Sequence, residues 1–189
     1  MAIIKKNPWI MGASGMVMDQ IVYRQMGGKT VVSAKPAKSS NPPSEAQLNH
    51  RALFNRASAY GKMAMRNPLL NEIYAAQANS MNSTYTMALK DYMHAPVIEA
   101  FILKDFVGKA GDRIGLYASD NFGIATVEMT ILDHEGKALE RGDCTEVVKN
   151  GVYEYVVQAD LPEGGVYSLR AEARDLAGNV TELQKEVGL

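Results

Sequence analysis

The sequence predicts an α+β protein with an extended N-terminal arm carrying a β-hairpin, a small helical module and a C-terminal antiparallel β-sandwich. Three observations predict this arrangement. Two β-prone runs flank a glycine pair early in the chain, apolar residues then recur at helical spacing, and from Pro96 onward short alternating runs are separated by turn residues. We therefore divide the 189 residues into segments 1–43, 44–94 and 95–189.

The N-terminal segment is predicted to be an arm. Its β-prone runs, residues 21–24 and 30–32, lie on either side of Gly27 and Gly28, which can adopt the positive φ angles of a tight hairpin turn. A two-stranded hairpin is at best marginally stable in water, so we expect this one to pack on a sheet edge or a helix. The proline-rich stretch 33–43 predicts an extended linker, roughly 30 Å long at about 3 Å per residue.

The middle segment is predicted to contain three helices. The first begins at Ser44, because Ser44 and Gln47 have the spacing of a capping box. The second begins at Asn67-Pro68, a capping residue followed by proline at the first helical position. A third is expected over residues 84–92. Ten of the eleven methionines precede the sandwich, where they suit either a small core or a surface that accepts a partner.

The C-terminal segment reads as short strands with no helical insertion. Turn-forming clusters such as Asn150-Gly151 separate the runs, and alternation gives each strand one apolar face. Six or seven such strands are typical of a sandwich or barrel. We expect strands at residues 97–103, 113–118, 125–132, 152–158, 166–173 and 180–187.

Two resemblances to bacterial proteins accompany these patterns. The run from Gly165-Val166-Tyr167 to Asp175-Leu176-Ala177-Gly178-Asn179, preceded by Asp112-Arg113-Ile114 and Ala118-Ser119-Asp120, resembles bacterial immunoglobulin-like domains and implies an Ig-like sandwich without the paired cysteines of antibody domains. The N-terminal half resembles an uncharacterised bacterial family with a Gly-rich start, a Tyr-Arg…Gly-Lys-Thr hairpin and short helices before an Ig-like domain. The matching residues include Tyr23, Arg24, Gly28, Lys29, Thr30, Ser44 and Gln47. Neither resemblance implies an activity.

Basic and acidic residues are unevenly distributed along the chain, although its formal net charge is only −1. Residues 1–94 hold 11 Lys/Arg and 4 Asp/Glu, a net +7, whereas residues 95–189 hold 9 and 17, a net −8. This asymmetry favours attraction between the halves, within one molecule or between neighbours, and permits contact of the basic half with nucleic acid. The start of the chain has no continuous apolar region typical of a signal peptide, and we expect cytoplasmic synthesis, no membrane partner, and a final place in an extracellular or particle-associated assembly.

Catalytic and metal chemistry find little support in the sequence. His50, His94 and His134 lack the spacing of a zinc site, and Cys144 lies in an acidic stretch that would not activate its thiol. Asp120 and the Asp175–Asn179 turn could share one end of the sandwich and bind calcium, but such residues more often bond their own backbone. We expect no enzyme activity, no cofactor and no metal.

The leading hypothesis for function is a non-enzymatic structural subunit that self-assembles into a filament, tube or particle shell. Its arm would leave the body and add to the sheet edge or acidic sandwich face of a neighbouring copy. Other structural proteins are a second class of partner. The alternatives are a monomeric Ig-like module that binds a protein or glycan, and a nucleic-acid-associated particle protein. The residues expected to make the assembly contact are Tyr23, Arg24, Lys29, Val31 and Val32.

Overall fold

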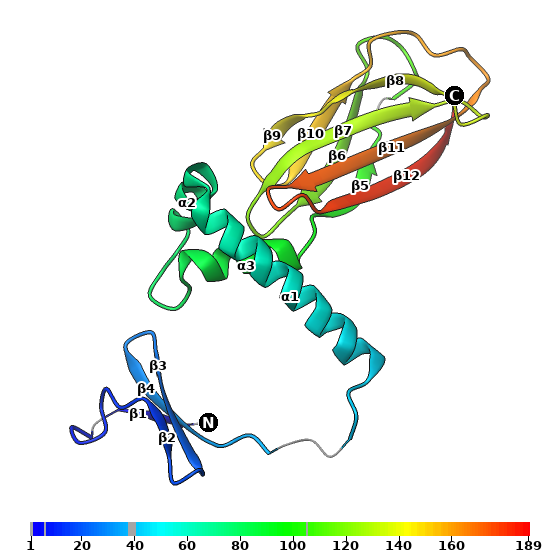
Figure 1. Ribbon diagram of the computed structural model, residues 1–189. Helices are drawn as coiled ribbons and strands as arrows, with labels where there is room; N and C mark the ends of the chain where they lie inside the picture. The colour runs from blue at the N-terminus through cyan, green and yellow to red at the C-terminus, as the bar shows by residue number, and fades with distance from the viewer. Residues whose placement is uncertain (1, 6, 38–40, 105) are drawn as a thin grey trace. The chain divides into compact units, whose positions relative to one another are not determined.

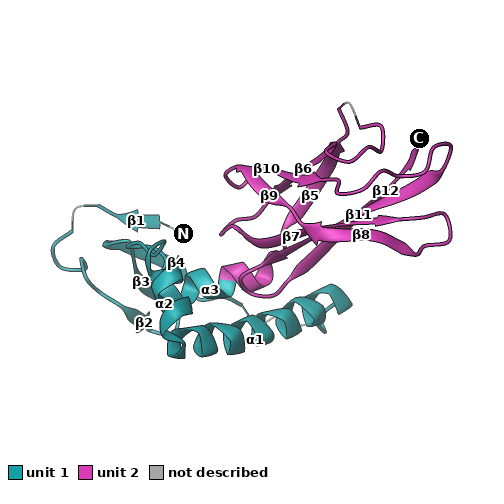
Figure 2. Cartoon of the chain, turned by 90° about the horizontal axis from the view of Figure 1, so that it is seen from above, with its two compact units in different colours: residues 1–89 teal, residues 90–189 magenta. Residues whose placement is uncertain are grey.

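A computed structural model describes residues 2–5, 7–37, 41–104 and 106–189 (Figure 1). The chain forms two compact units, residues 1–89 and residues 90–189 (Figure 2). The first unit contains a small β-sheet and most of the helical segment, and the second contains the β-sandwich. The predicted α+β class is confirmed. The predicted linker falls partly outside the described residues, at positions 38–40.

The arm is a four-stranded antiparallel sheet in which the predicted hairpin forms the two central strands. The hairpin strands are β3 (Ile21–Met26) and β4 (Lys29–Ala34), joined by Gly27 and Gly28 at φ 57° and 73°. Positive φ at both central positions is the requirement of a type I′ turn. The flanking strands are β1 (Ala2–Ile4) and β2 (Gly15–Val17), giving the order β1-β4-β3-β2.

The hairpin was expected to pack on a sheet edge or a helix, and in the structure strands from the same arm pair with both of its edges. Strand β1 pairs with β4, and β2 pairs with β3. The sequence does not predict the flanking strands, because each has only three residues, too few for an alternating pattern to be recognised.

The three predicted helices are α1 (Glu45–Arg66), α2 (Pro68–Ala75) and α3 (Thr84–Met93). The capping box at the start of α1 is present in both directions, and the Asn67 side chain accepts hydrogen bonds from the first turn of α2. Gly61 lets the ring of Tyr85 approach α1, since a Cβ at that position would lie 2.8 Å from the ring.

The sandwich consists of two four-stranded antiparallel sheets. One has the order β5-β6-β10-β9 and the other β12-β11-β7-β8. In the lettering of the immunoglobulin fold, β5, β6 and β7 are strands A, B and C, β8 is the extra strand C′, and β9 to β12 are strands D to G. The two sheets are then A-B-E-D and G-F-C-C′, which is the strand order of that fold. The bounds are Val97–Ile102 (β5), Arg113–Ser119 (β6), Ile124–Leu132 (β7), Ala138–Asp143 (β8), Thr145–Val148 (β9), Val152–Val156 (β10), Val166–Asp175 (β11) and Val180–Gly188 (β12).

Six of these strands match the predicted runs, whereas β8 and β9 were missed. The chain passes from β8, an edge of the sheet β12-β11-β7-β8, to β9, an edge of the sheet β5-β6-β10-β9. The change of sheet occurs at Cys144, whose N–H donates to the Val127 carbonyl at 2.8 Å. Both strands are edge strands with mostly exposed residues, so neither carries the apolar alternation by which the other six were recognised.

The sandwich core lies between the two sheets. Ile114, Leu116, Met129, Ile131 and Leu169 are fully buried there, each from an inward-facing position of its strand. A tyrosine corner closes one end of the fold. The hydroxyl of Tyr167, at the start of β11, donates to the Pro162 carbonyl five residues upstream at 2.6 Å, the contact typical of immunoglobulin-like domains.

Candidate functional site

The five residues predicted to make the assembly contact all lie on the central strands of the arm sheet. Tyr23 and Arg24 are on β3, directly opposite Val32 and Val31 on β4, and Lys29 begins β4. Because β3 and β4 are each paired on both sides within the chain, their main chains are already used. Main-chain pairing of the described arm sheet with a neighbour would therefore use β1 or β2, and the assembly contact of the five predicted residues stays a prediction.

The edges of the arm sheet are β1 and β2, which carry the main-chain groups that face away from the sheet. Both are short and almost entirely exposed. Unpaired strand edges are templates for pairing with another chain. The arm thus retains the capacity for strand addition that the sequence suggested, but at its edge strands.

Large apolar side chains are exposed throughout the arm. They include the only tryptophan in the chain, Trp9, which is 93% exposed in the loop between β1 and β2. The others are Ile3, Met11, Met16, Val17, Met18, Ile21 and Met26. Single exposed apolar residues are ordinary on protein surfaces, but clustering within one short segment indicates a contact surface.

The arm sheet has almost no interior of its own. Among its described residues only Thr30 and Val31 are buried. Thr30 is held by polar contacts: its hydroxyl oxygen accepts from the Gly12 N–H and the Gln25 amide, both at 2.9 Å, and Gln25 also donates to the Ala13 carbonyl at 2.7 Å. These bonds tie the β1–β2 loop to the sheet without covering its apolar side chains.

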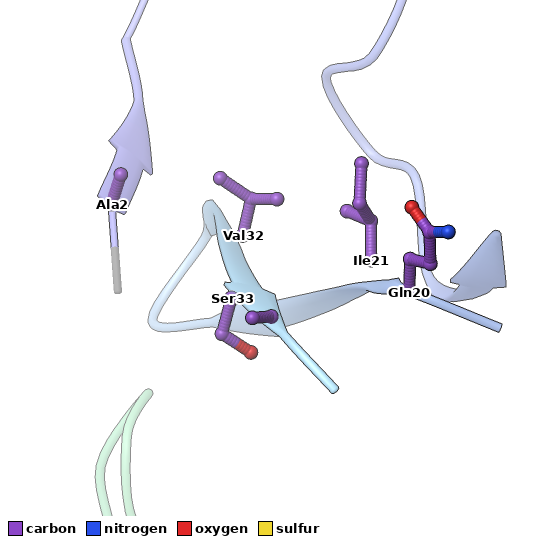
Figure 3. A pocket seen from close by; sticks show the side chains of 6 residues that line it. Ala2, Gln20, Ile21, Val32 and Ser33 are labelled. Carbon is purple, nitrogen blue, oxygen red and sulfur yellow. The ribbon is translucent and has the colours of Figure 1, made fainter. Parts of the chain in front are cut away.

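A hollow at one end of the arm sheet shows this lack of cover. Its apolar lining comes from Ala2, Ile21 and Val32, with Gln20 and Ser33 beside them (Figure 3). The hollow spans three strands or their ends, β1, β3 and β4. Apolar side chains from adjacent strands therefore face an open space.

The turn between β2 and β3 presents another unusual feature. Met18 and Asp19 have φ angles of 50° and 56°, in the left-handed region that non-glycine residues seldom adopt. Met18 is also 88% exposed. The turn holds a flexible apolar side chain out into solvent at the end of the edge strand β2.

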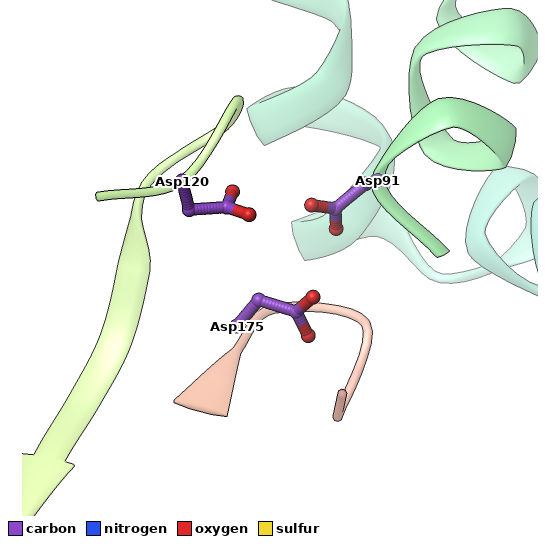
Figure 4. A group of neighbouring side chains, drawn as sticks. All are labelled: Asp91, Asp120 and Asp175. Atoms are coloured by element: carbon purple, nitrogen blue, oxygen red, sulfur yellow. The ribbon is translucent and has the colours of Figure 1, made fainter. Parts of the chain in front are cut away.

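A second candidate site lies in the sandwich unit, where three aspartates converge. One carboxylate oxygen from each of Asp91, Asp120 and Asp175 lies within 4.8 Å of the other two (Figure 4). Asp91 is on the last turn of α3, Asp120 follows β6, and Asp175 ends β11. This is the one group of three or more potential metal-ligating side chains in the part of the chain that the structure describes.

Each aspartate of this cluster is held by the local structure. The Asp120 Oδ2 atom accepts from the N–H groups of Phe122 and Gly123 at 2.7 and 3.1 Å, which is the backbone bonding the sequence predicted. Asp175 accepts from the Asn179 backbone N–H and side-chain amide, both at 2.7 Å. The same amide reaches the Asp91 carbonyl at 3.2 Å and so links the last turn of α3 to the β11–β12 turn.

Burial and a neighbouring negative charge affect the pKa of a carboxyl group in this cluster. The Asp91 and Asp175 residues are 0% and 2% exposed. Burial raises the pKa of the Asp175 carboxyl, and the neighbouring Asp120 charge raises it further, against the hydrogen bonds from Asn179. The sequence pointed to Asp120, Asp175 and Asn179 but not to Asp91, because Asp91 comes from a different element far earlier in the chain.

The cysteine and the three histidines lie on or beside separate elements of the chain. Burial raises the pKa of the Cys144 thiol to about 12, with Asp143 and Glu128 adding to the effect. His50 lies on α1, His94 follows α3, and His134 lies in the turn after β7.

No described helix is long and apolar enough to span a membrane.

Comparisons with known proteins give limited information. No family model and no curated protein matches the chain. Among solved structures, CopC from Methylosinus trichosporium OB3b is 21% identical over 41% of this chain and 76% of CopC, with a TM-score of 0.33. The N-terminal part of the bacterial S-layer protein SbsC is 8% identical over 74% of this chain and 39% of its own, with a TM-score of 0.35.

A β-glucuronidase from Ruminococcus gnavus is 18% identical over 50% of this chain, with a TM-score of 0.25. This chain spans only 15% of that enzyme. At such TM-scores these similarities say nothing about function. The resemblance of the N-terminal half to a bacterial family stays a prediction.

Proposed function

We propose that the protein is a non-catalytic structural subunit that assembles with copies of itself through its N-terminal arm. The observation that carries the proposal is the arm sheet, which has four strands, exposed apolar side chains and two buried residues. A small sheet is stable in water only when an apolar face is covered. The proposed cover is a neighbouring copy.

The charges of the two units favour a second copy as the occupant. Residues 1–35 hold five Lys/Arg and one Asp, whereas residues 90–189 hold ten Lys/Arg and eighteen Asp/Glu. The basic arm and the acidic sandwich unit therefore attract each other, and opposite charge steers association between molecules.

The sandwich offers an edge suited to strand addition. Strand β9 is an edge strand whose four residues are all exposed, and its Val147 and Val148 are 55% and 54% exposed. Addition of β1 or β2 from a neighbour to β9 would pair the main chains and cover apolar side chains on both. Contact between different surfaces of identical copies propagates into a filament unless the geometry closes a ring.

The test is the mass of the purified full-length protein across a concentration series, measured by light scattering and accompanied by negative-stain imaging. We expect regular particles or fibres. A 20.6 kDa monomer at every concentration would refute the proposal and favour the monomeric binding module. Particles that form only with bound nucleic acid, and dissolve when it is digested, would favour the nucleic-acid hypothesis.

Variants at the arm edges locate the contact. Ile3→Lys on β1 and Val17→Lys on β2 replace side chains that are half-exposed in the single chain, so the fold should tolerate both. Together they should reduce the assembled fraction at least tenfold, because an edge lysine opposes strand pairing. Leu69→Lys on α2 is the matched control, since Leu69 is 67% exposed and lies outside the arm. Equal loss of assembly in the control would contradict a contact through the arm.

A further inference from the structure

We propose that Asp91, Asp120 and Asp175 bind a calcium ion at one end of the sandwich, a site that the sequence alone did not favour. The three side chains come from α3 and from the turns after β6 and β11, and Figure 4 shows their carboxyl groups directed toward one another. The site is independent of the arm and of its assembly.

The orientation of Asp120 is the first argument for a bound cation. Its Oδ2 atom accepts the two turn N–H groups, but its Oδ1 atom is buried and accepts no hydrogen bond from the described residues. A buried carboxylate oxygen without a donor loses the solvation it has in water and costs free energy unless a positive charge compensates it. The Asp120 carboxyl group is one of the three that converge at this end of the sandwich.

The charge of the cluster is the second argument. Three carboxylates whose oxygens lie within 4.8 Å of one another repel, and burial strengthens that repulsion. Neither Asp120 nor Asp175 has a basic side chain within 4.0 Å among the described residues. Asp91 is also on the last turn of α3, where the negative end of the helix dipole disfavours a carboxylate. A divalent cation removes all three penalties together.

The ligand chemistry identifies calcium as the ion. The donors are oxygen atoms, which suit hard cations and exclude a typical zinc site. Calcium binds oxygens at about 2.3–2.6 Å, so two of its ligands lie up to about 5 Å apart, and the observed limit of 4.8 Å fits this span. Magnesium demands near-octahedral geometry at about 2.0–2.1 Å and keeps several of its waters, so a site that offers three protein carboxylates suits calcium better.

Calcium binding would fix the position of the chain segment that leads into the sandwich. Asp91 precedes β5, and Asn179 already bridges the Asp91 and Tyr92 carbonyls to the β11–β12 turn. Calcium would add a charged link among the last turn of α3, the β6–β7 turn and the β11–β12 turn. We therefore expect the ion to stabilise residues 90–189 as a unit.

The test is calorimetric titration of the chelator-treated full-length protein with calcium chloride, paired with thermal unfolding. We expect one ion per chain and a rise in Tm on the order of 10 °C at a hundredfold excess over Kd. Absence of binding heat together with an unchanged Tm would overturn the site. Tighter binding of magnesium than of calcium would overturn the choice of ion.

A matched pair of variants separates this site from binding elsewhere. Asp120→Asn keeps an oxygen for the Phe122 and Gly123 N–H groups but removes one charge, so calcium affinity should fall at least tenfold. Its Tm in chelator should equal or exceed that of the wild type, because repulsion is reduced. Asp133→Asn is the control, since the Asp133 Oδ1 atom also accepts two turn N–H groups but lies outside the cluster. Unchanged affinity in Asp120→Asn, or equal loss in Asp133→Asn, would refute the proposal.

Discussion

The arm sheet and the sandwich are both antiparallel and built from short strands, but they differ in what their strands enclose. The two sheets of the sandwich face each other across fifteen buried apolar residues, whereas the four strands of the arm bury Thr30 and Val31. Strand pairing is similar in the two regions, so pairing alone does not make a stable unit. The sandwich supplies its own second layer, whereas the arm sheet leaves most of its described apolar side chains exposed.

The largest expected effect of a single substitution is in the sandwich core. Leu169→Ala removes a side chain that is 0% exposed at the centre of β11, and should lower the free energy of unfolding by about 2–5 kcal/mol. Urea denaturation followed by circular dichroism measures this loss. The comparison is Val31→Ala in the arm, which should leave the main transition within about 0.5 kcal/mol of the wild type.

The unfolding of these two variants can contradict the contrast between the sandwich and the arm. An equal loss in Leu169→Ala and Val31→Ala would mean that the arm and the sandwich unfold together, and that the arm is stabilised by its own chain. The measurement should be made at low protein concentration, because assembly would otherwise stabilise the arm by mass action.

Thiol reactivity gives the next largest contrast. Burial raises the pKa of Cys144 from its ordinary 9.0 to about 12, and only the thiolate reacts. At pH 8 Cys144 should react with iodoacetamide at least about a hundredfold more slowly than a cysteine placed in the arm, as each pKa unit changes the thiolate fraction tenfold. The comparison protein is Cys144→Ser/Met18→Cys, because Met18 is 88% exposed. Similar rates would show that the sandwich edge opens readily.

The same pKa fixes the sign of a pH effect. The folded protein holds the Cys144 proton more tightly than the unfolded chain does, so the associated stability is complete below about pH 9 and is lost as pH rises toward 12. Tyr153 acts in the same direction between about pH 10 and 12, chiefly because burial raises its pKa. Between pH 8 and 11 the Tm of the wild type should fall more steeply than that of Cys144→Ser.

Much of the fold could be predicted because local signals and tertiary structure agree. Ser44 and Asn67 cap helices where their side chains are expected to, and the glycine pair 27–28 makes the predicted turn. The strands with one buried face were recognised from their alternation. Strands β8 and β9 were not, because an edge strand that buries little need not alternate, and the three-residue strands of the arm are shorter than the pattern itself.

The candidate sites were harder to predict because they depend on partners distant in the chain. The turn motifs placed Asp120, Asp175 and Asn179 at one end of a sandwich, and the structure brings them together there. Asp91 comes from helix α3, and no spacing in the sequence predicts that it lies beside them. The sequence predicts an assembly contact at Tyr23 and Val31 because a two-stranded hairpin is too small to be stable alone, but it does not predict that β1 and β2 pair with the edges of that hairpin.

The smallest effect concerns the tyrosine corner. Tyr167→Phe removes the hydrogen bond to the Pro162 carbonyl and should cost about 1–2 kcal/mol, because a part-buried acceptor loses its donor. Tyr117→Phe is the control: Tyr117 is 47% exposed on β6, and its change should be within about 0.5 kcal/mol. Thermal and urea unfolding measure both.

A double-mutant cycle tests whether the Tyr167 hydroxyl stabilises the sandwich through its hydrogen bond to the Pro162 carbonyl. A Cβ at Gly165 would lie 2.6 Å from the Tyr167 hydroxyl oxygen, so Gly165→Ala must displace that hydroxyl and weaken the same bond. The two substitutions should therefore cost less together than the sum of their separate costs. Strict additivity would mean that Gly165→Ala does not act through this bond and that Gly165 is required for another reason. A corner that is measurably stabilising would add a second internal constraint to the sandwich, beside its core, for which the arm has no counterpart.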